Sequence, residues 1–508
     1  MIRPTPVTPV DAEPGSITDR LGGMRVEVDG SLRRRLGEVC AVVEDDDVAR
    51  AEAARDWWPL AIGWAADGQV PARPDVVARP TDTGQVAAVL ALCHRARVPV
   101  TAAGGRSGVC GASVPLFGGV ALDLCGLAGL GDVDATSLVA DVRAGTFGPD
   151  VEAGLRDGHG LTLGHWPQSM DLSTVGGWLA CRGAGQYSNR YGKIEDMVTG
   201  LEVVLADGTV VRTGGNAPRS ATGPDLTQLF VGSEGTLGVI TEGRFRVHPV
   251  PAGEDRRAFG FPSFAEGLDA CRRILRRGAT PAVLRLYDQT ESGRSFDRPD
   301  TCVLIVLDEA DPGLVEATMA VVDQECRADR LDAALVERWL GHRNDVSALA
   351  PLWRSGLVVD TVEVAARWRA LPDLYTAVLE ALAGVEGTLV ASSHQSHAYT
   401  DGACLYFTFA GRPPAVTGGG EPDHGEIRAW TGGYYRRAWD EVTRATEVAG
   451  GAISHHHGIG LNRARFLPGA LGSGFPVLAA LKQALDPDGI LNPGKLGLPH
   501  PFGEVPWP

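Results

Sequence analysis

The stretch Asp171-Leu172-Ser173-Thr174-Val175-Gly176-Gly177 opens the part of the chain that decides the fold. Two more glycine-rich blocks lie on either side of this stretch, which is the second loop in chain order. The first loop, Gly104-Gly105-Arg106-Ser107-Gly108, precedes it, and the third loop, Gly232-Ser233-Glu234-Gly235-Thr236-Leu237-Gly238-Val239-Ile240-Thr241, follows it. Small residues let the backbone approach a ligand closely, and successive N–H groups form concavities for phosphate oxygens. Turns also need glycine, so one such loop would be weak evidence. Three of them, each beside a strand-like run, indicate a large phosphate-bearing cofactor.

Length and composition restrict the class of protein. The 508 residues exceed what one hydrophobic core supports, so two or more domains are expected. Hydrophobic residues make up 44%, which is typical of a soluble globular protein, and there is no run of eighteen apolar residues to span a membrane. The net charge of -16 argues against a general nucleic-acid binder but leaves room for a local basic pocket.

Two features favour a cytoplasmic location. Residues 1–16 are rich in Pro, Thr and acidic residues and hold no apolar signal core, so export by that route is not expected. The nine cysteines are scattered without a C-x-x-C pair, and an odd number without motif spacing fits reduced thiols. We therefore expect a cytoplasmic protein with no catalytic cysteine.

Apolar periodicity predicts the first elements. Residues 1–72 read as a helical lead-in, after which residues 75–80 read as a strand, 83–97 as a helix and 98–101 as a second strand. The first glycine loop follows that second strand at once, an arrangement suited to a nucleotide site. It is not the G-x-G-x-x-G dinucleotide pattern, because this loop opens no evident helix.

Turn signals predict the remaining organisation. The pair Asp207-Gly208 divides two β-rich runs over residues 198–211 and predicts a hairpin. Pro249-Val250-Pro251 breaks the pattern and is expected to end the first domain. Helices and strands alternate beyond it, with an α+β texture. The predicted domains are the lead-in at 1–72, a cofactor domain at 73–250, a substrate-covering domain at 251–445 and a C-terminal segment at 446–508.

Five blocks resemble the FAD-linked oxidases of the vanillyl-alcohol oxidase superfamily, whose FAD-binding domain is of the PCMH type. Within it they resemble the alkyldihydroxyacetonephosphate synthases of ether-lipid synthesis. The blocks are 171–178, Tyr191-Gly192-Lys193-Ile194-Glu195-Asp196, Ser220-Ala221-Thr222-Gly223-Pro224-Asp225, Gly402-Ala403-Cys404-Leu405-Tyr406-Phe407 and Ser454-His455-His456-His457-Gly458-Ile459-Gly460. The tail Asn492-Pro493-Gly494-Lys495 is also typical. The resemblance implies an α+β fold with a two-subdomain FAD-binding domain, an α+β cap domain and a C-terminal segment that packs back at the flavin site.

The resemblance also implies which residues hold FAD, with the first loop at the pyrophosphate. The expected cofactor-binding residues are Ala103, Gly104, Gly105, Arg106, Ser107, Gly108, Asp171, Ser173, Thr174, Gly176, Gly177, Arg182, Gly183, Ala184, Glu234, Gly235, Thr236, Leu237, Gly238, Val239 and Ile240. Relatives that attach flavin covalently use a His in the first loop, sometimes with a Cys in the second. Here the first loop has Arg106 and the second has Ser173 and Thr174, so FAD is expected to be non-covalent.

The triplet His455-His456-His457 is the most distinctive local feature. Metal binding is one interpretation, but adjacent side chains diverge too much to ligate one ion well, and no metal is expected. The resemblance places the triplet beside the flavin as acid/base and positioning groups, and imidazole titrates near neutral pH. A structural turn is the remaining alternative.

Tyr406 lies in a predicted strand over residues 403–410, with Phe407 and Phe409 on the opposite face. It is either a half-buried strand tyrosine with a satisfied hydroxyl or, as the resemblance implies, an acid/base residue. A phenol is a weak base unless a neighbour lowers its pKa, and the histidine triplet is the expected neighbour. His394 and His397 precede this strand and are expected either to line the same pocket or to be ordinary loop histidines.

Two arginines are candidates for gripping a carboxylate or phosphate. Arg285 stands in the otherwise apolar run Leu284-Arg285-Leu286-Tyr287, which favours it over a surface arginine. Arg354 occupies roughly the place of the substrate-binding arginine of the synthases. Arg272, Arg273, Arg276 and Arg277 are expected instead on a solvated helix face.

Three functions remain open. The synthase resemblance implies exchange of the acyl group of an acyl-dihydroxyacetone phosphate for a long-chain alcohol through a flavin adduct. The alternative is a D-2-hydroxy-acid dehydrogenase or oxidase of the D-lactate or glycolate type, because fold does not fix function. The least expected function is flavin binding without catalysis. The expected partner is a small molecule, either a phosphorylated acyl-ketone or a 2-hydroxy acid, and a homodimer is left open.

Overall fold

The computed structural model describes residues 9–215, 217–413 and 424–507, which form two compact units. Unit 1 comprises Met1–Ala184, Lys193–Pro249 and His456–Pro508, and unit 2 comprises Gly185–Gly192 and Val250–His455. Residues 1–8 of the expected lead-in and residue 508 of the expected C-terminal segment lie outside the described residues. Among the helices of the described ranges, none is both long and apolar enough to span a membrane.

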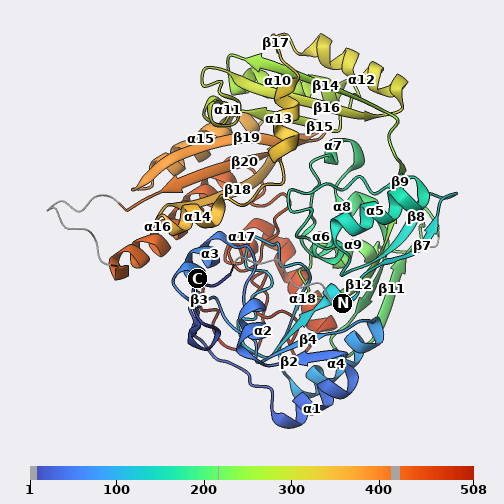
Figure 1. Cartoon of the computed structure of the whole chain (residues 1–508), viewed down its shortest axis with the longest axis vertical. Coiled ribbons are helices and arrows are strands. Elements are labelled where there is room, and N and C mark those ends of the chain that lie inside the picture. Colours follow the sequence, from blue (N-terminus) through green and yellow to red (C-terminus); the bar gives the residue numbers. More distant parts are fainter. Residues whose placement is uncertain (1–8, 216, 414–423, 508) are drawn as a thin grey trace. The chain divides into compact units, whose positions relative to one another are not determined.

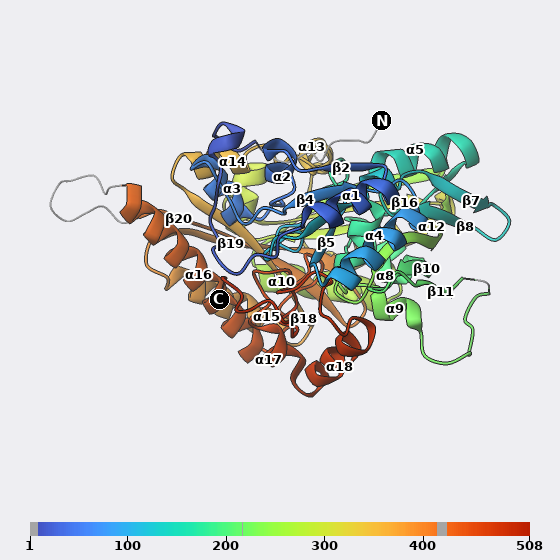
Figure 2. The same ribbon diagram turned by 90° about the horizontal axis from the view of Figure 1, so that it is seen from below.

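Unit 1 contains a four-stranded sheet in the order β2-β4-β6-β5, formed by Val42–Glu44, Val76–Arg79, Val120–Asp123 and Val100–Ala103. Strands β4, β6 and β5 are parallel, as a strand–helix–strand unit requires. The intervening helix α4 (Thr83–Ala96) begins at Asp82, whose side chain accepts from the Gln85 N–H, and ends at Arg97 in the left-handed conformation. Helix α1 (Gly30–Val39) packs against α4 (Figure 2). The predicted strand, helix and strand are confirmed.

A five-stranded antiparallel sheet in unit 1 has the order β11-β10-β12-β8-β7 (Figure 1). Its strands are Val210–Gly214, Val198–Val204, Val239–Arg246, Val139–Arg143 and Leu130–Asp134. The predicted hairpin joins β10 to β11, with Gly208 at a φ of 91° that favours glycine. The third glycine loop leads directly into β12, so this sheet fixes one end of that loop.

Shorter elements complete unit 1. The strands pair as β1 with β3 and β13 with β9, which are Thr18–Asp19, Gln69–Val70, His248–Pro249 and Leu161–Thr162. The remaining helices are α2 (Asp47–Glu52), α3 (Pro59–Ala66), α5 (Gly148–His159), α6 (Val175–Cys181), α8 (Ile194–Met197), α9 (Leu226–Phe230), α17 (Leu467–Leu471) and α18 (Phe475–Leu485). The lead-in that the sequence predicts to be helical contains three short helices, α1 to α3.

The C-terminal tail is buried in unit 1 through polar groups. Lys482 on α18 donates to the carbonyls of Thr236 and Leu491 and lies 2.5 Å from Asp486, and all of these contacts are buried. Asn492 donates to the carbonyls of Ala112 and Glu234. Buried charges and amides of this kind cost stability unless they are bonded, so the tail is fixed against the third glycine loop.

Unit 2 is built on a seven-stranded sheet in the order β17-β14-β16-β15-β19-β20-β18. Its strands are β14 (Gly253–Phe261), β15 (Val283–Tyr287), β16 (Cys302–Ala310), β17 (Asp329–Leu331), β18 (Val358–Arg367), β19 (Thr388–Ala398) and β20 (Gly402–Gly411), and neighbouring strands are antiparallel. The helices are α7 (Ser188–Tyr191), α10 (Phe264–Arg276), α11 (Gln289–Phe296), α12 (Pro312–Glu325), α13 (Ala334–His342), α14 (Leu349–Arg354), α15 (Leu371–Ala383) and α16 (His424–Val448).

The two faces of this sheet differ in character. Phe407 and Phe409 are fully buried on one face of β20, and Phe409 contacts Tyr434 and Tyr435 of α16. Because side chains alternate along a strand, Tyr406 points to the other face. The α15 and α16 side of β20 is therefore hydrophobic core, and the opposite side carries polar groups.

We predict that Asp486→Ala destabilises unit 1 by about 3 kcal/mol, because it leaves Lys482 buried without its partner. Asp486 is 1% exposed and also accepts from the backbone N–H groups of Ile490 and Leu491. Urea unfolding followed by fluorescence measures the loss. The matched control is Asp488→Ala, whose partly exposed carboxylate makes only long ion pairs with His94 and Arg97 and is expected to cost under about 1 kcal/mol. An equal effect of the two substitutions would contradict the burial argument.

Candidate active site

Three of the four stretches of expected flavin residues in unit 1 contain a non-glycine residue with positive φ. These are Arg106 at 52°, Arg182 at 57° and Glu234 at 50°. L-residues adopt this conformation at a cost, and such residues concentrate at functional sites. Arg182 adopts this conformation as the left-handed C-cap residue that ends α6.

The first and second loops approach each other closely. A Cβ atom placed on Gly104 would lie 2.1 Å from Oγ1 of Thr174, and one on Gly105 would lie 2.0 Å from the carbonyl oxygen of Leu172. Any side chain at these two positions would push the loops apart. The glycines expected from the sequence to hold the cofactor therefore also bring the two loops together.

Several buried polar atoms around these loops have no hydrogen-bond partner among the described residues. They are Oγ1 of Thr174, Oγ of Ser233, and Nε and Nη2 of Arg106, whose Nη1 lies 3.6 Å from Asp123. Leaving such groups unsatisfied costs free energy, so they indicate a ligand with hydrogen-bonding groups. A guanidinium and two hydroxyls suit the phosphate and hydroxyl oxygens of FAD, and the residues present fit this cofactor.

Glu234 differs from the other expected cofactor residues. Its carboxylate accepts the N–H of Ile459 at 2.6 Å and of Gly460 at 2.8 Å. Burial raises its pKa to about 7, although these two bonds and Lys495 oppose the shift. The side chain thus holds the turn that follows His457. The Glu234 backbone is also occupied, because its N–H donates to the Ala180 carbonyl and its own carbonyl accepts from Asn492. The cofactor role expected of Glu234 stays a prediction. Glu234 and Ile459 are 225 positions apart in the sequence, so no local pattern predicts this bond.

The other expected cofactor residues divide by exposure. Gly108, Asp171 and Arg182 are exposed, and Arg182 lies 3.4 Å from Glu195. The buried members are Ala103, Gly105, Arg106, Ser173, Thr174, Gly183, Ala184, Glu234, Thr236, Leu237, Gly238, Val239 and Ile240, and Gly104, Ser107, Gly176, Gly177 and Gly235 are half-buried. Their individual roles toward FAD stay predictions.

Unit 2 presents a row of functional side chains across four strands. The register pairs Tyr287 of β15 with His394 of β19, His394 with Tyr406 of β20, and Tyr406 with Glu363 of β18. Directly paired residues share a face of the sheet. The ring centroids of Tyr287 and His394 are 5.1 Å apart, and those of His394 and Tyr406 are 5.0 Å apart. Two of the predicted site residues, His394 and Tyr406, are thus brought into contact.

Arg285 lies beside this row on the same face of β15, two residues from Tyr287. Its Nη2 donates to Nε2 of His394 at 2.7 Å and its Nε to the Tyr287 hydroxyl at 3.2 Å. The guanidinium also lies 5.5 Å from the ring of Trp339 on α13. An arginine held by aromatic rings and by neutral acceptors, with no acid of its own, is suited to an anionic ligand.

Arg354 does not join this group. It is exposed at the end of α14, which packs against β18, whereas Arg285 is on β15, three strands away in the sheet. Of the two arginines predicted for substrate binding, only Arg285 lies next to His394. The role of Arg354 stays a prediction.

The pKa of Tyr406 is raised, not lowered as expected from the histidine triplet. Burial is the main cause, and Glu363 and Asp360 add to it, while a hydrogen bond from the Thr361 hydroxyl opposes it. The expectation that a histidine neighbour makes this phenol a base is therefore wrong. Tyr406 stays protonated at neutral pH and is suited to donate a hydrogen bond or a proton.

His394 and His397 lie on a strand, β19, rather than in a loop before β20. Burial and the charge of Arg285 lower the pKa of His394, although Glu291 opposes the shift. His394 is therefore neutral at pH 7. His397 is buried, and its Nδ1 lies 2.7 Å from the hydroxyl of Ser188 on α7.

The first residue of the histidine triplet is fixed at the end of the row. His455 donates its backbone N–H to Glu363 at 2.7 Å, and its Nε2 lies 3.0 Å from the hydroxyl of Tyr399. Its ring stacks on His397 with centroids 5.1 Å apart. Sequence reasoning missed Glu363, Tyr399 and Ser188, because no local motif marks them. His456 and His457 belong to unit 1, with ring centroids 4.5 Å apart.

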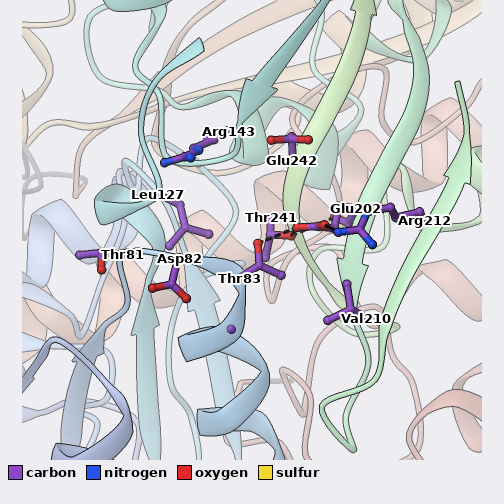
Figure 3. Close-up of a pocket in the computed structure, with 11 residues that line it drawn as sticks. Thr81, Asp82, Thr83, Leu127, Arg143, Glu202, Val210, Arg212, Thr241 and Glu242 are labelled. Carbon is purple, nitrogen blue, oxygen red and sulfur yellow. Dashed lines mark hydrogen bonds and ion pairs between the residues drawn. The ribbon is translucent and has the colours of Figure 1, made fainter. Parts of the chain in front are cut away.

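A separate cavity of about 490 Å³ lies in unit 1 where the first turn of α4 faces the five-stranded sheet (Figure 3). Glu202 accepts from the hydroxyls of Thr83 at 2.6 Å and Thr241 at 3.0 Å and pairs with Arg212. None of the residues expected at the cofactor or the substrate lines this cavity. The cavity meets the glycine-rich blocks only at Thr241, the last residue of the block 232–241.

Two family models match the chain. The FAD binding domain matches residues 74–214, and the C-terminal domain of FAD linked oxidases matches residues 251–496. An FAD-linked oxidoreductase of Escherichia coli O157:H7, named YgcU and described as uncharacterized, is 31% identical over 443 residues, which cover 83% of this chain and 89% of the relative. The chain belongs to the FAD-linked oxidase family. Its members are enzymes with FAD as cofactor, so the predicted recognition, cofactor and enzymatic nature are confirmed.

Two further relatives have named activities. Alkyldihydroxyacetonephosphate synthase of Dictyostelium discoideum is 29% identical over 500 residues, covering 89% of this chain and 78% of the relative. Glycolate oxidase subunit GlcD of Bacillus subtilis is 29% identical over 461 residues, covering 86% and 92%. A solved structure of an alkyldihydroxyacetonephosphate synthase superposes with a TM-score of 0.76 at 25% identity, covering 96% of this chain and 88% of that one. The predicted fold class is confirmed.

We predict that Gly104→Ala abolishes FAD binding, because the added methyl group would collide with Thr174 and separate the first and second loops. The measurement is the ratio of flavin to protein absorbance after purification. Gly158→Ala on α5 is the matched control, since a Cβ atom there meets nothing within 4 Å. A yellow Gly104→Ala protein with a full complement of flavin would contradict the close approach of the loops.

The cofactor is predicted to be non-covalent, because Arg106, Ser173 and Thr174 offer no imidazole or thiol to the flavin ring. After precipitation with trichloroacetic acid, all of the yellow colour should remain in the supernatant. Flavin that stays with the precipitated polypeptide would show this prediction to be wrong.

Proposed function

We propose that this enzyme is a synthase-type flavoenzyme that exchanges the acyl group of an acyl-dihydroxyacetone phosphate for a long-chain alcohol. The observation that carries the proposal is the row in which a protonated Tyr406 and a neutral His394 lie beside Arg285. The named synthase relative and the solved structure of an alkyldihydroxyacetonephosphate synthase support this assignment. The alcohol substrate makes lipid metabolism the proposed process, and nine cysteines that form no disulfide support a cytoplasmic compartment.

In this proposal each residue has a stated task. Arg285 grips the phosphate group of the substrate through its remaining N–H donors. The Tyr406 hydroxyl donates to the ketone oxygen and so acidifies the neighbouring C–H group. His456 or His457 accepts the proton released there, and His455, fixed by Glu363 and Tyr399, orients the triplet. FAD, when bound, supplies the electron-accepting ring system on which such an exchange depends.

A second candidate is a D-2-hydroxy-acid dehydrogenase or oxidase. The observation that favours it is the contact between Arg285 and the neutral His394, because an arginine grips a carboxylate and a neutral imidazole can accept a hydroxyl proton. The GlcD relative supports this candidate. In it, two electrons would pass from the substrate carbon to FAD, and no alcohol would be incorporated.

We predict that Tyr406→Phe lowers turnover by about 10²-fold or more while FAD stays bound, because the variant loses only the donor hydroxyl. The measurement is incorporation of labelled hexadecanol into an alkyl ketone phosphate. Because the pKa of Tyr406 is raised, wild-type activity should show no loss from phenol ionisation up to about pH 10.

The matched control is Tyr375→Phe on α15, whose hydroxyl contacts Asp288 on the core side of the sheet. It is expected to keep turnover near the wild-type value. Full activity of the Tyr406→Phe enzyme would contradict the role proposed for this residue.

A further inference from the structure

Glu291 is a buried acid beside the candidate anion-binding arginine and has no counterpart among the residues expected from the sequence. It lies on α11 and is 3% exposed. Its Oε1 accepts from the hydroxyls of Ser392 and Thr408, each at 2.9 Å, and lies 2.8 Å from Nη2 of Arg294. Its Oε2 faces Nδ1 of His394 at 3.6 Å. One carboxylate oxygen is therefore occupied by three donors, and the other is directed at the histidine.

The contact between Arg285 and His394 fixes the protonation of the histidine ring. Arginine carries only donors, so Nε2 of His394, 2.7 Å from Nη2 of Arg285, has to be an acceptor without a hydrogen. In a neutral imidazole the single proton then sits on Nδ1. Oε2 of Glu291 lies 3.6 Å from Nδ1, which is within ion-pair distance but longer than a hydrogen bond. Carboxylate, imidazole and guanidinium thus form a chain in which each member sets the orientation of the next.

We propose that Glu291 is the positioning residue of this site, holding His394 in the Nδ1-protonated tautomer and thereby directing Arg285 toward an anionic ligand. The ligand part of this inference rests on the proposed function, in which Arg285 grips the substrate anion. The tautomer part rests only on the contacts within unit 2.

The arrangement determines which edge of Arg285 meets the ligand. Of its five N–H donors, Nε–H is given to Tyr287 and one Nη2–H to His394. The donors that remain are both N–H groups of Nη1 and the second N–H of Nη2. These face outward at the end of the guanidinium, so a phosphate or carboxylate is expected to bind end-on to the fork.

Glu291→Gln tests the tautomer directly. The amide oxygen is expected to take the place of Oε1, because Ser392, Thr408 and Arg294 all donate there. The amide NH₂ group then faces Nδ1 of His394, which becomes an acceptor, the ring proton moves to Nε2, and His394 no longer accepts from Arg285. Nitrogen-15 NMR of histidine-labelled protein reads the tautomer, with the His394 signals assigned from a His394→Gln sample.

The proposal predicts Nδ1–H in the wild type, Nε2–H in Glu291→Gln and Nδ1–H again in Glu291→Asp, which restores the carboxylate. An Nε2–H or doubly protonated His394 in the wild type overturns it without any variant. So does an unchanged Nδ1–H tautomer in Glu291→Gln.

Binding of inorganic phosphate to the FAD-loaded enzyme, measured by isothermal titration calorimetry, tests the second part. The dissociation constant should rise roughly 10-fold in Glu291→Gln, as expected for a misplaced charged hydrogen bond. An unchanged constant in that variant overturns the positioning role. Phosphate that fails to bind the wild type counts against the anion grip of the proposed function, whereas the tautomer result stands independently of it.

Asp288→Asn is the matched control for loss of a buried acid on the same helix. Asp288 is 3% exposed, caps α11 by accepting the Glu291 N–H, and contacts Ser393 on the core side of the sheet. A purely structural effect would appear equally in this variant. We expect Asp288→Asn to lower stability while leaving the His394 tautomer and the phosphate constant unchanged.

Discussion

The register between β19 and β20 is the constraint on which the candidate site of unit 2 depends. It places His394 opposite Tyr406, and the β18 register then places Glu363 next to Tyr406. A slip of one residue would turn these side chains into the apolar core and expose Phe407 and Phe409 instead. The burial of those two phenylalanines therefore holds the reactive groups in place. The register shifts between Gln395 and His397, and beyond this shift the His397 side chain contacts the hydroxyl of Ser188.

Unit 1 uses a different device, which is strain held by buried polar bonds. Arg106 and Glu234 adopt positive φ within two of the glycine-rich segments, and Arg182 does so at the end of α6. The C-terminal tail counteracts this strain, because Asn492 donates to the Glu234 carbonyl and Lys482 to the Thr236 carbonyl. The same Glu234 carboxylate fixes the turn after His457. Cofactor loop, histidine turn and tail thus form one bonded structure within this unit.

Local signals in the sequence predicted the parts of the fold that short-range physics controls. The β4–α4–β5 unit, the Asp207-Gly208 hairpin and the β20 strand all follow from periodicity and turn chemistry. The sequence did not predict that His394 and His397 lie on a strand, because Ser, Gln and His are weak strand formers. Nor did it point to Glu291, Glu363 or Ser188, which only long-range register brings to the site. The predicted direction of the Tyr406 pKa shift was wrong for a related reason, because burial, which raises this pKa, also depends on long-range packing.

The most direct test of the proposed chemistry is the flavin spectrum of the purified enzyme, recorded anaerobically with two kinds of substrate. An acyl-dihydroxyacetone phosphate with a long-chain alcohol should give the alkyl product while the flavin ends oxidised, and no D-2-hydroxy acid should bleach it. Complete bleaching by one D-2-hydroxy acid, without alkyl product from the ketone phosphate, would contradict the synthase proposal and establish a dehydrogenase or oxidase on the same scaffold.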